Sequence, residues 1–117
     1  MNKDAIHTKI RVTLINGESE RFYGPGVQDL LFWIRKEGSV KDACEAMGLS
    51  YTKGRRILKH AEAVLGCSLV TRKQGGRTGG SSTLTPEAEQ FMARYEKLAD
   101  SVSAYAQKQL EELFIDS

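Results

Sequence analysis

Cysteine, proline and long apolar runs are scarce in this chain of 117 residues. Its two cysteines, Cys44 and Cys67, are too far apart for a CxxC metal site, and neither has the neighbouring histidine of a zinc ligand set. No apolar run approaches the roughly 18 residues of a membrane span, and the N-terminus lacks the apolar core of a signal peptide. We therefore expect a cytoplasmic protein with no metal, no cofactor and no membrane contact.

Patterns typical of catalytic sites are missing too. His7 and His60 stand alone, and no paired-carboxylate, Ser/His/Asp or Cys/His arrangement is present. The segment from Gly75 to Ser82 has glycines and serines in the order of a nucleotide phosphate loop. It lacks the lysine before the serine and the strand-to-helix setting of such a loop. The chain is not expected to be an enzyme.

Two short helices that meet at a tight corner are predicted between residues 38 and 62. Ser39 and Asp42 have the spacing of a capping box at the start of the first helix. Gly48 suits the left-handed conformation that ends it, and Ser50 caps the second helix. The first helix carries apolar residues on one face, two of them small enough to admit a second helix backbone: Ala43, Cys44 and Met47. This punctuation is typical of a helix-turn-helix.

The second helix has one apolar side and one basic side. At about 100° per residue, its buried stripe is predicted to comprise Gly54, Ile57, Leu58, Ala61, Val64 and Leu65. The other side presents Tyr51, Thr52, Lys53, Arg55, Arg56 and Lys59. From residue 51 to residue 77 there are seven basic residues and one acidic residue, Glu62, so this segment carries +6 while the remainder carries −4. A solvated helix face explains single charges, but not charge of one sign on a projecting corner.

A glycine-rich hairpin is predicted after this helix. Its strands are expected at Ser68 to Arg72 and Ser82 to Thr85, joined by a turn from Gly75 to Gly80. Glycines allow the turn to lie against a phosphate backbone, and three basic residues supply charge: Arg72, Lys73 and Arg77. The hairpin is predicted to be the wing of a winged helix-turn-helix.

These motifs resemble the winged helix-turn-helix of LysR-type bacterial regulators, and more closely the DNA-binding domain of the ModE family. The resemblance covers roughly Gly24 to Leu98. The corresponding features are Gly38 and Ser39, the small pair Ala43 and Cys44, the run from Gly48 to Tyr51, Leu65 and Gly66, the wing from Arg72 to Thr85, and the helix that begins at Pro86. The resemblance implies a DNA-binding transcription regulator.

The chain departs from the ModE pattern in two ways. Where such sequences often have alanine and tryptophan within the second helix, this chain has Gly54 and Arg55, so we expect its base-reading set to be its own. The given sequence stops at Ser117, before the region where ModE proteins carry a molybdate-binding domain. We therefore expect DNA affinity to be insensitive to molybdate.

A β-hairpin is predicted at the N-terminus. Lys9 to Ile15 alternates polar and apolar residues, Asn16 and Gly17 signal a hairpin turn, and Arg21 to Tyr23 forms the return strand. The hairpin either covers the core or forms a dimer or partner surface.

The next helix is expected to begin near Pro25 and to end at Gly38, with one buried stripe comprising Val27, Leu30, Leu31 and Ile34. Phe32 and Trp33 fall off that stripe. They need a second packing surface from the hairpin, the last helix or a partner subunit.

A single helix of up to 29 residues is predicted from Pro86 to Phe114, with Thr85 as its N-cap. Large apolar residues alternate spacings of four and three along it: Phe91, Tyr95, Leu98, Val102 and Tyr105. Beyond them the apolar positions shift to Ala106, Leu110 and Leu113. We interpret the first set as a dimerisation seam that joins two copies of the chain.

The sequence thus predicts one mainly α domain with a little β (α+β), a winged helix-turn-helix over residues 1–117. Its parts are an N-terminal hairpin at 1–23, the helix-turn-helix and wing at 24–85, and a long dimerisation helix at 86–117. The predicted function is sequence-selective binding of double-stranded DNA by a homodimeric transcription regulator, with the second helix in the major groove and the wing on the backbone. The DNA-contacting residues are expected to be Ser39, Ser50, Tyr51, Thr52, Lys53, Arg55, Arg56, Lys59, Arg72, Lys73 and Arg77. The alternative is a protein-interaction module built on a winged helix that no longer binds DNA.

Overall fold

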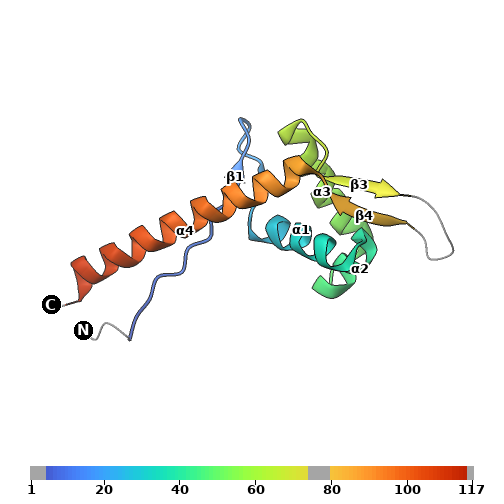
Figure 1. Cartoon of the computed structure of the whole chain (residues 1–117). Coiled ribbons are helices and arrows are strands. Elements are labelled where there is room, and N and C mark those ends of the chain that lie inside the picture. The colour runs from blue at the N-terminus through green and yellow to red at the C-terminus, as the bar shows by residue number, and fades with distance from the viewer. Residues whose placement is uncertain (1–4, 74–79, 116–117) are drawn as a thin grey trace.

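The computed structural model describes residues 5–73 and 80–115. In chain order the described elements are β1 (Leu14–Ile15), β2 (Arg21–Tyr23), α1 (Pro25–Glu37), α2 (Val40–Met47), α3 (Tyr51–Leu65), β3 (Val70–Lys73), β4 (Ser81–Leu84) and α4 (Pro86–Phe114). The strands form two antiparallel pairs, β1 with β2 and β3 with β4. Figure 1 shows α1, α2 and α3 gathered with the strand pairs toward one end, and α4 projecting away from them. This is the α+β winged helix-turn-helix that the sequence predicts.

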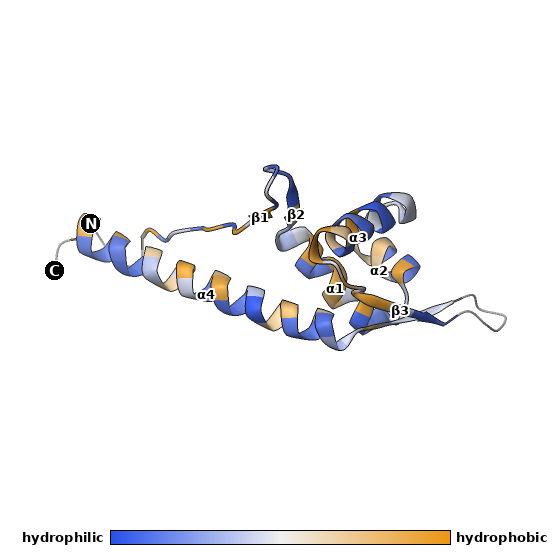
Figure 2. Ribbon diagram, turned by 90° about the horizontal axis from the view of Figure 1, so that it is seen from above, coloured by the Kyte–Doolittle hydropathy of each residue, from blue (hydrophilic) through white to orange (hydrophobic). Residues whose placement is uncertain are grey.

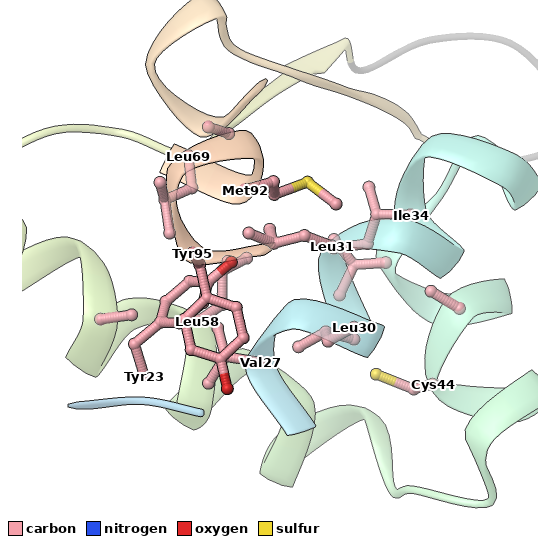
Figure 3. Close-up of a cluster of buried hydrophobic side chains, with 14 residues drawn as sticks. Tyr23, Val27, Leu30, Leu31, Ile34, Cys44, Leu58, Leu69, Met92 and Tyr95 are labelled. Atoms are coloured by element: carbon pink, nitrogen blue, oxygen red, sulfur yellow. The ribbon is translucent and has the colours of Figure 1, made fainter. Parts of the chain in front are cut away.

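Helix α1 lies at the centre of the core and contacts α2, α3 and α4. Its buried residues are the predicted stripe: Val27, Leu30, Leu31 and Ile34. Figure 3 shows these side chains beside Leu58 of α3, Leu69 before β3 and Met92 of α4, all of which are buried. The three-helix core is therefore closed by the first turns of α4 and by the entry to the wing.

The aromatic pair on α1 lies outside this stripe, as predicted. Trp33 is half-buried against the core, with the Lys36 ammonium 5.0 Å from its ring centroid. Phe32 meets Trp33 edge to face, with centroids 5.5 Å apart, but is 44% exposed. Trp33 thus finds its packing surface within the chain, and Phe32 remains at the surface.

The N-terminal hairpin is shorter than predicted. Among the described residues, Leu14 and Ile15 are the ones that pair with β2, because Gly24 and Pro25 begin α1 directly after Tyr23 and leave no partner for residues before Leu14. The prediction of a strand from residue 9 is therefore wrong.

The turn of this hairpin is also longer than a two-residue Asn-Gly turn. The Asn16 side chain accepts hydrogen bonds from the backbone N–H groups of Glu18 and Glu20, both at 2.9 Å, and Ser19 takes φ 64°. Asn16 thus organises a larger loop through its side chain.

Residues 5–13 form an extended arm that runs beside α4, as Figure 1 shows. The Tyr95 hydroxyl donates to the Val12 carbonyl at 2.6 Å, and the Thr8 backbone N–H donates to the Gln107 side-chain oxygen at 3.2 Å. Val12 and Leu14 pack on the core, whereas Ile10 is 41% exposed. Of the two roles considered for the N-terminal segment, covering the core is the one that these contacts show.

The wing strands are displaced by one or two residues from their predicted positions. They pair in register from Val70 with Leu84 to Lys73 with Ser81. The first strand cannot begin at Ser68, because the carbonyls of Ser68 and Leu69 accept hydrogen bonds from Thr85 instead. The predicted turn at residues 75–80 lies, except for residue 80, outside the described residues.

Helix α4 has the predicted bounds, and Thr85 caps it by accepting a hydrogen bond from the Ala88 backbone N–H at 3.1 Å. Its N-terminal half packs on the core and its C-terminal half extends beyond it, accompanied by the N-terminal arm. Figure 2 shows that apolar residues recur along this projecting half. None of the described helices is long and apolar enough to cross a membrane.

Candidate nucleic-acid interface

The corner between α2 and α3 is built by the capping residues that the sequence indicates. The Ser39 hydroxyl accepts from the Asp42 backbone N–H at 3.0 Å, and the Ser50 hydroxyl accepts from the Lys53 backbone N–H at 3.1 Å. Gly48, between the helices, takes φ 70°. These bonds satisfy backbone groups that the helix ends leave open, and they fix the direction in which α3 leaves the corner.

Helices α2 and α3 pack closely against each other at Gly54 and Cys44. A Cβ atom placed on Gly54 would stand 2.2 Å from the Cys44 sulfur, far inside van der Waals contact. Cys44 is 1% exposed, and burial raises the pKa of its thiol, so it acts as a small apolar side chain, as predicted. Gly54 and Cys44 together place the opposite face of α3 outward.

The outward face of α3 has a crest and two flanks. The crest consists of Thr52, Arg56 and Lys59, which are all exposed and lie opposite the buried residues of the helix. The wing flank consists of Tyr51, Arg55 and Glu62; Tyr51 borders the groove beside β3, Glu62 bonds to Leu69 just before β3, and Arg55 lies against Tyr51. The hairpin flank, on the side of β2, consists of Lys53 and His60.

The wing flank meets a groove between α2 and the wing. This α2–wing groove is lined by residues 37–42, Tyr51, Arg72, Lys73 and residues 80–82. The wing is held there because the Ser82 backbone N–H donates to the Gly38 carbonyl at 2.8 Å. Arg72 and Lys73 of β3 are thereby placed beside the first turn of α2, where the groove is also lined by Lys41 and by the acidic Glu37 and Asp42.

Arg55 is half-buried, and its guanidinium carbon lies 5.7 Å from the centroid of the Tyr51 ring. Its Nε is buried without a hydrogen-bond partner among the described residues. Arg56 and Lys59, by contrast, extend from the crest as exposed side chains.

The hairpin flank is closed by a contact that sequence reasoning did not find. The His60 Nε2 lies 3.1 Å from the Arg21 carbonyl oxygen of β2, so the histidine ties α3 to the hairpin. In the sequence His60 stands alone, and nothing near it indicates a partner for its ring. No local signal identifies the true one, because the two residues are 39 positions apart.

The acidic residue of the basic segment is used inside the fold. Glu62 accepts a hydrogen bond from the Leu69 backbone N–H at 2.7 Å, which holds the entry to β3. An ion pair joins Arg35 of α1 to Glu89 of α4 at 2.6 Å. This pair lies away from the described basic residues of α3 and β3, of which Lys53, Arg56, Lys59, Arg72 and Lys73 are exposed.

The predicted DNA-contacting residues are mostly brought together. Tyr51 links the crest of α3 to the α2–wing groove, since it borders both. Arg72 and Lys73 line the groove, whereas Ser39 and Ser50 use their hydroxyls as caps. Arg77 lies outside the described residues. Other residues that line the groove were missed, although their neighbours in α2 and the wing pointed to them; they include Lys41, Ser81 and Ser82 and the acidic Glu37 and Asp42.

The predicted dimerisation seam divides into two parts. Phe91 and Tyr95 pack around Tyr23 of the same chain, with ring centroids 4.6 Å and 5.0 Å from it. The remaining seam residues are 43%, 38% and 58% exposed, namely Leu98, Val102 and Tyr105. Only this second part has a surface to offer another molecule.

Comparison with known proteins shows a distant similarity to two molybdenum-related proteins. The chain is 35% identical to the molybdenum-pterin-binding protein MopB of Rhodobacter capsulatus over 66 residues, which are 56% of this chain and 24% of MopB. It is 29% identical to the molybdenum transport protein ModE of Herbaspirillum seropedicae over 85 residues, which are 73% of this chain and 30% of ModE. No family model matches the chain. The matched segment thus spans about a quarter to a third of the length of these curated relatives.

Proposed function

We propose that the protein is a ModE-like transcription regulator that binds double-stranded DNA sequence-selectively. The crest of α3 enters the major groove, and the wing lies on the neighbouring sugar–phosphate backbone. The observation that carries the proposal is the arrangement of Arg56, Lys59, Arg72 and Lys73. All four are exposed on adjoining surfaces, while the nearby Glu62 is turned to the Leu69 backbone.

The fold supports this placement through geometry as well as charge. Gly54 lets α3 sink against α2, and the hydrogen bond from Ser82 to Gly38 fixes the wing beside the same corner. A helix that projects three polar or basic side chains can meet base edges, while wing residues beside it meet phosphates. The similarity to MopB and ModE supports a ModE-like regulator. Whether molybdate affects DNA binding by this chain is tested in the binding assay below.

We further propose that the protein acts as a homodimer joined by the exposed part of α4. Leu98, Val102 and Tyr105 lie beyond the core on a helix about 43 Å long at 1.5 Å per residue. A two-fold axis makes such a stripe complementary to itself and sets two α3 helices toward successive major grooves. The operator is then an inverted repeat with half-sites about 10 base pairs apart or a multiple of that.

The proposal is tested by selecting bound sequences from a random duplex pool with the full chain, followed by fluorescence anisotropy at increasing salt. We expect one enriched motif and an affinity that falls steeply with salt, because basic residues release counterions from DNA. Lys59→Ala should weaken binding, whereas the matched control Lys97→Ala, on exposed α4, should not.

Absence of both enrichment and salt-dependent retention would contradict DNA binding and favour a protein-interaction module. Adding molybdate to the same assay should leave the binding midpoint unchanged. A tenfold shift would instead assign the chain an oxyanion response.

A further inference from the structure

Arg55 and Arg56 are adjacent in sequence, yet the fold gives them different surroundings. Arg56 points away from the buried residues Gly54, Leu58 and Ala61 and is exposed at the centre of the crest. Arg55 is turned about 100° around the helix from it and belongs to the wing flank. The two guanidinium groups therefore face different parts of any DNA that α3 approaches.

The Arg55 side chain is held in place before any ligand binds. Tyr51 is one helical turn earlier, and side chains on a helix lean toward its N-terminus, so Arg55 reaches back over the Tyr51 ring. Its Nε is enclosed by protein and has no partner among the described residues. A buried Nε fixes the plane of the guanidinium, while its two terminal amino groups remain the donors that a ligand could use.

The location of the pair favours a phosphate. Arg55 rests on Tyr51, which lines the α2–wing groove together with Arg72 and Lys73. Arg55 itself lines the adjoining hollow, where Tyr51, Arg56 and Lys59 are its neighbours. A fixed guanidinium donates two parallel hydrogen bonds to a phosphate group, and the neighbouring charges favour an anion. The crest projects farthest from the core, so base edges in the major groove lie nearer to Arg56.

We propose that Arg55, held on Tyr51, binds one DNA backbone phosphate between α3 and the wing, and that Arg56 alone of the two reads a guanine edge. This assignment rests on the proposed DNA binding. It gives different roles to Arg55 and Arg56, which the sequence places together on one basic face. The position where this chain departs from the ModE pattern thereby positions the protein on DNA, and the next residue specifies the sequence.

The test uses two series of modified duplexes built on the selected operator. In each duplex of the first series, one phosphate is replaced by a neutral methylphosphonate. In each duplex of the second series, one guanine is replaced by 7-deazaguanine, which lacks the N7 acceptor. Anisotropy titrations compare the wild-type chain with Arg55→Ala, Arg55→Lys and the matched control Arg56→Ala, each checked for native helix content by circular dichroism.

We expect one methylphosphonate to weaken the wild-type chain by roughly tenfold and to leave Arg55→Ala unaffected, because the contact it removes is already lost. Arg55→Ala should weaken all sequences alike and reduce the salt slope by about one. Arg56→Ala should lose preference at one base pair by roughly tenfold and become insensitive to 7-deazaguanine there.

The assignment is overturned if Arg55→Ala flattens preference at a base pair, or if no single methylphosphonate distinguishes it from the wild-type chain. Both outcomes leave DNA binding intact. Failure of the wild-type chain to bind any duplex in a salt-dependent way would overturn the proposed function instead. Tyr51→Leu, compared with Tyr51→Phe, provides a second measurement: only the loss of the ring should reproduce the Arg55→Ala profile.

Discussion

Gly54 occupies a helix interior, where alanine is ordinarily preferred by about 1 kcal/mol. Glycine is needed at position 54 because a Cβ atom there would lie 2.2 Å from the Cys44 sulfur. Because Cys44 is enclosed in the core, the sulfur has little room to move, and we expect the clash to outweigh the helix propensity. At the residue scale, the path of α3 thus depends on one missing side chain.

We predict that Gly54→Ala lowers the free energy of unfolding by about 1–2 kcal/mol in urea denaturation. Adding Cys44→Ala removes the colliding sulfur, so the double variant should be more stable than the Gly54→Ala single variant. Strict additivity of the two changes would show that the helices do not touch as described.

Tyr23 links stability to alkaline pH. Desolvation by burial raises the pKa of its phenol well above the ordinary value of about 10, and Tyr95 adds to the rise. The folded state therefore disfavours the phenolate. Stability from this group is fully present below pH 10 and is lost as pH rises above it.

Accordingly, the free energy of unfolding should fall between pH 9 and pH 11, and Tyr23→Phe should reduce that fall. The variant also loses the hydroxyl's hydrogen bond to Gln28, so at pH 8 it should be less stable by about 1 kcal/mol. Tyr51→Phe, at a 43% exposed position outside the proposed dimer contact, is the matched control. If Tyr23→Phe showed the same pH dependence as the wild-type chain, Tyr23 would not be the source of the loss of stability at alkaline pH.

At the scale of elements, Thr85 joins the wing to α4. Its hydroxyl accepts from the Ala88 backbone N–H and donates to the Ser68 carbonyl at 2.8 Å, while its backbone N–H donates to the Leu69 carbonyl. One residue therefore ends the hairpin, starts the long helix and fixes the angle between them.

Thr85→Ala should cost about 1–2 kcal/mol of stability, because both the cap and the tie to Ser68 are lost. Thr85→Ser keeps the hydroxyl and should recover most of it. Thr83→Ala changes an exposed residue of β4, two positions before Thr85, and serves as the control in thermal unfolding. Equal losses from positions 83 and 85 would argue against a special role for the cap.

At the scale of the whole molecule, α4 is longer than the core it covers. The molecule measures 62 × 31 × 24 Å, and the projecting half of α4 accounts for its length in Figure 1. That half is covered on one side by the N-terminal arm, through Thr8 and Gln107. Leu98, Val102 and Tyr105 remain exposed and form the proposed dimer contact.

In sedimentation at micromolar concentration, we expect the wild-type chain to be a dimer and both Leu98→Glu and Val102→Glu to be monomers. A charge buried in an apolar contact without a partner is strongly unfavourable. Ser103→Glu places the same charge on another exposed side of α4 and should leave the dimer intact. A wild-type monomer, or a dimer that tolerates both charges, would refute the α4 interface.

The sequence alone determined where the helices begin, at Pro25 for α1, Ser39 for α2, Ser50 for α3 and Thr85 for α4. For α1 and α2 it also determined the end, at Gly38 and Gly48. Apolar spacing identified the buried stripe of α1, and one-sided charge identified the face of α3. These are local properties, which neighbours in the chain decide.

Only the tertiary structure decided which long-range partner each element takes. The arm leaves the sheet because Val12 bonds to Tyr95, 83 residues away, and His60 bonds to the carbonyl of Arg21. The seam of α4 splits because Tyr23 gathers Phe91 and Tyr95 into the core of the same chain. Apolar periodicity shows that a stripe must be buried, but the same spacing suits a core and a second subunit equally, so the choice between them is made by packing.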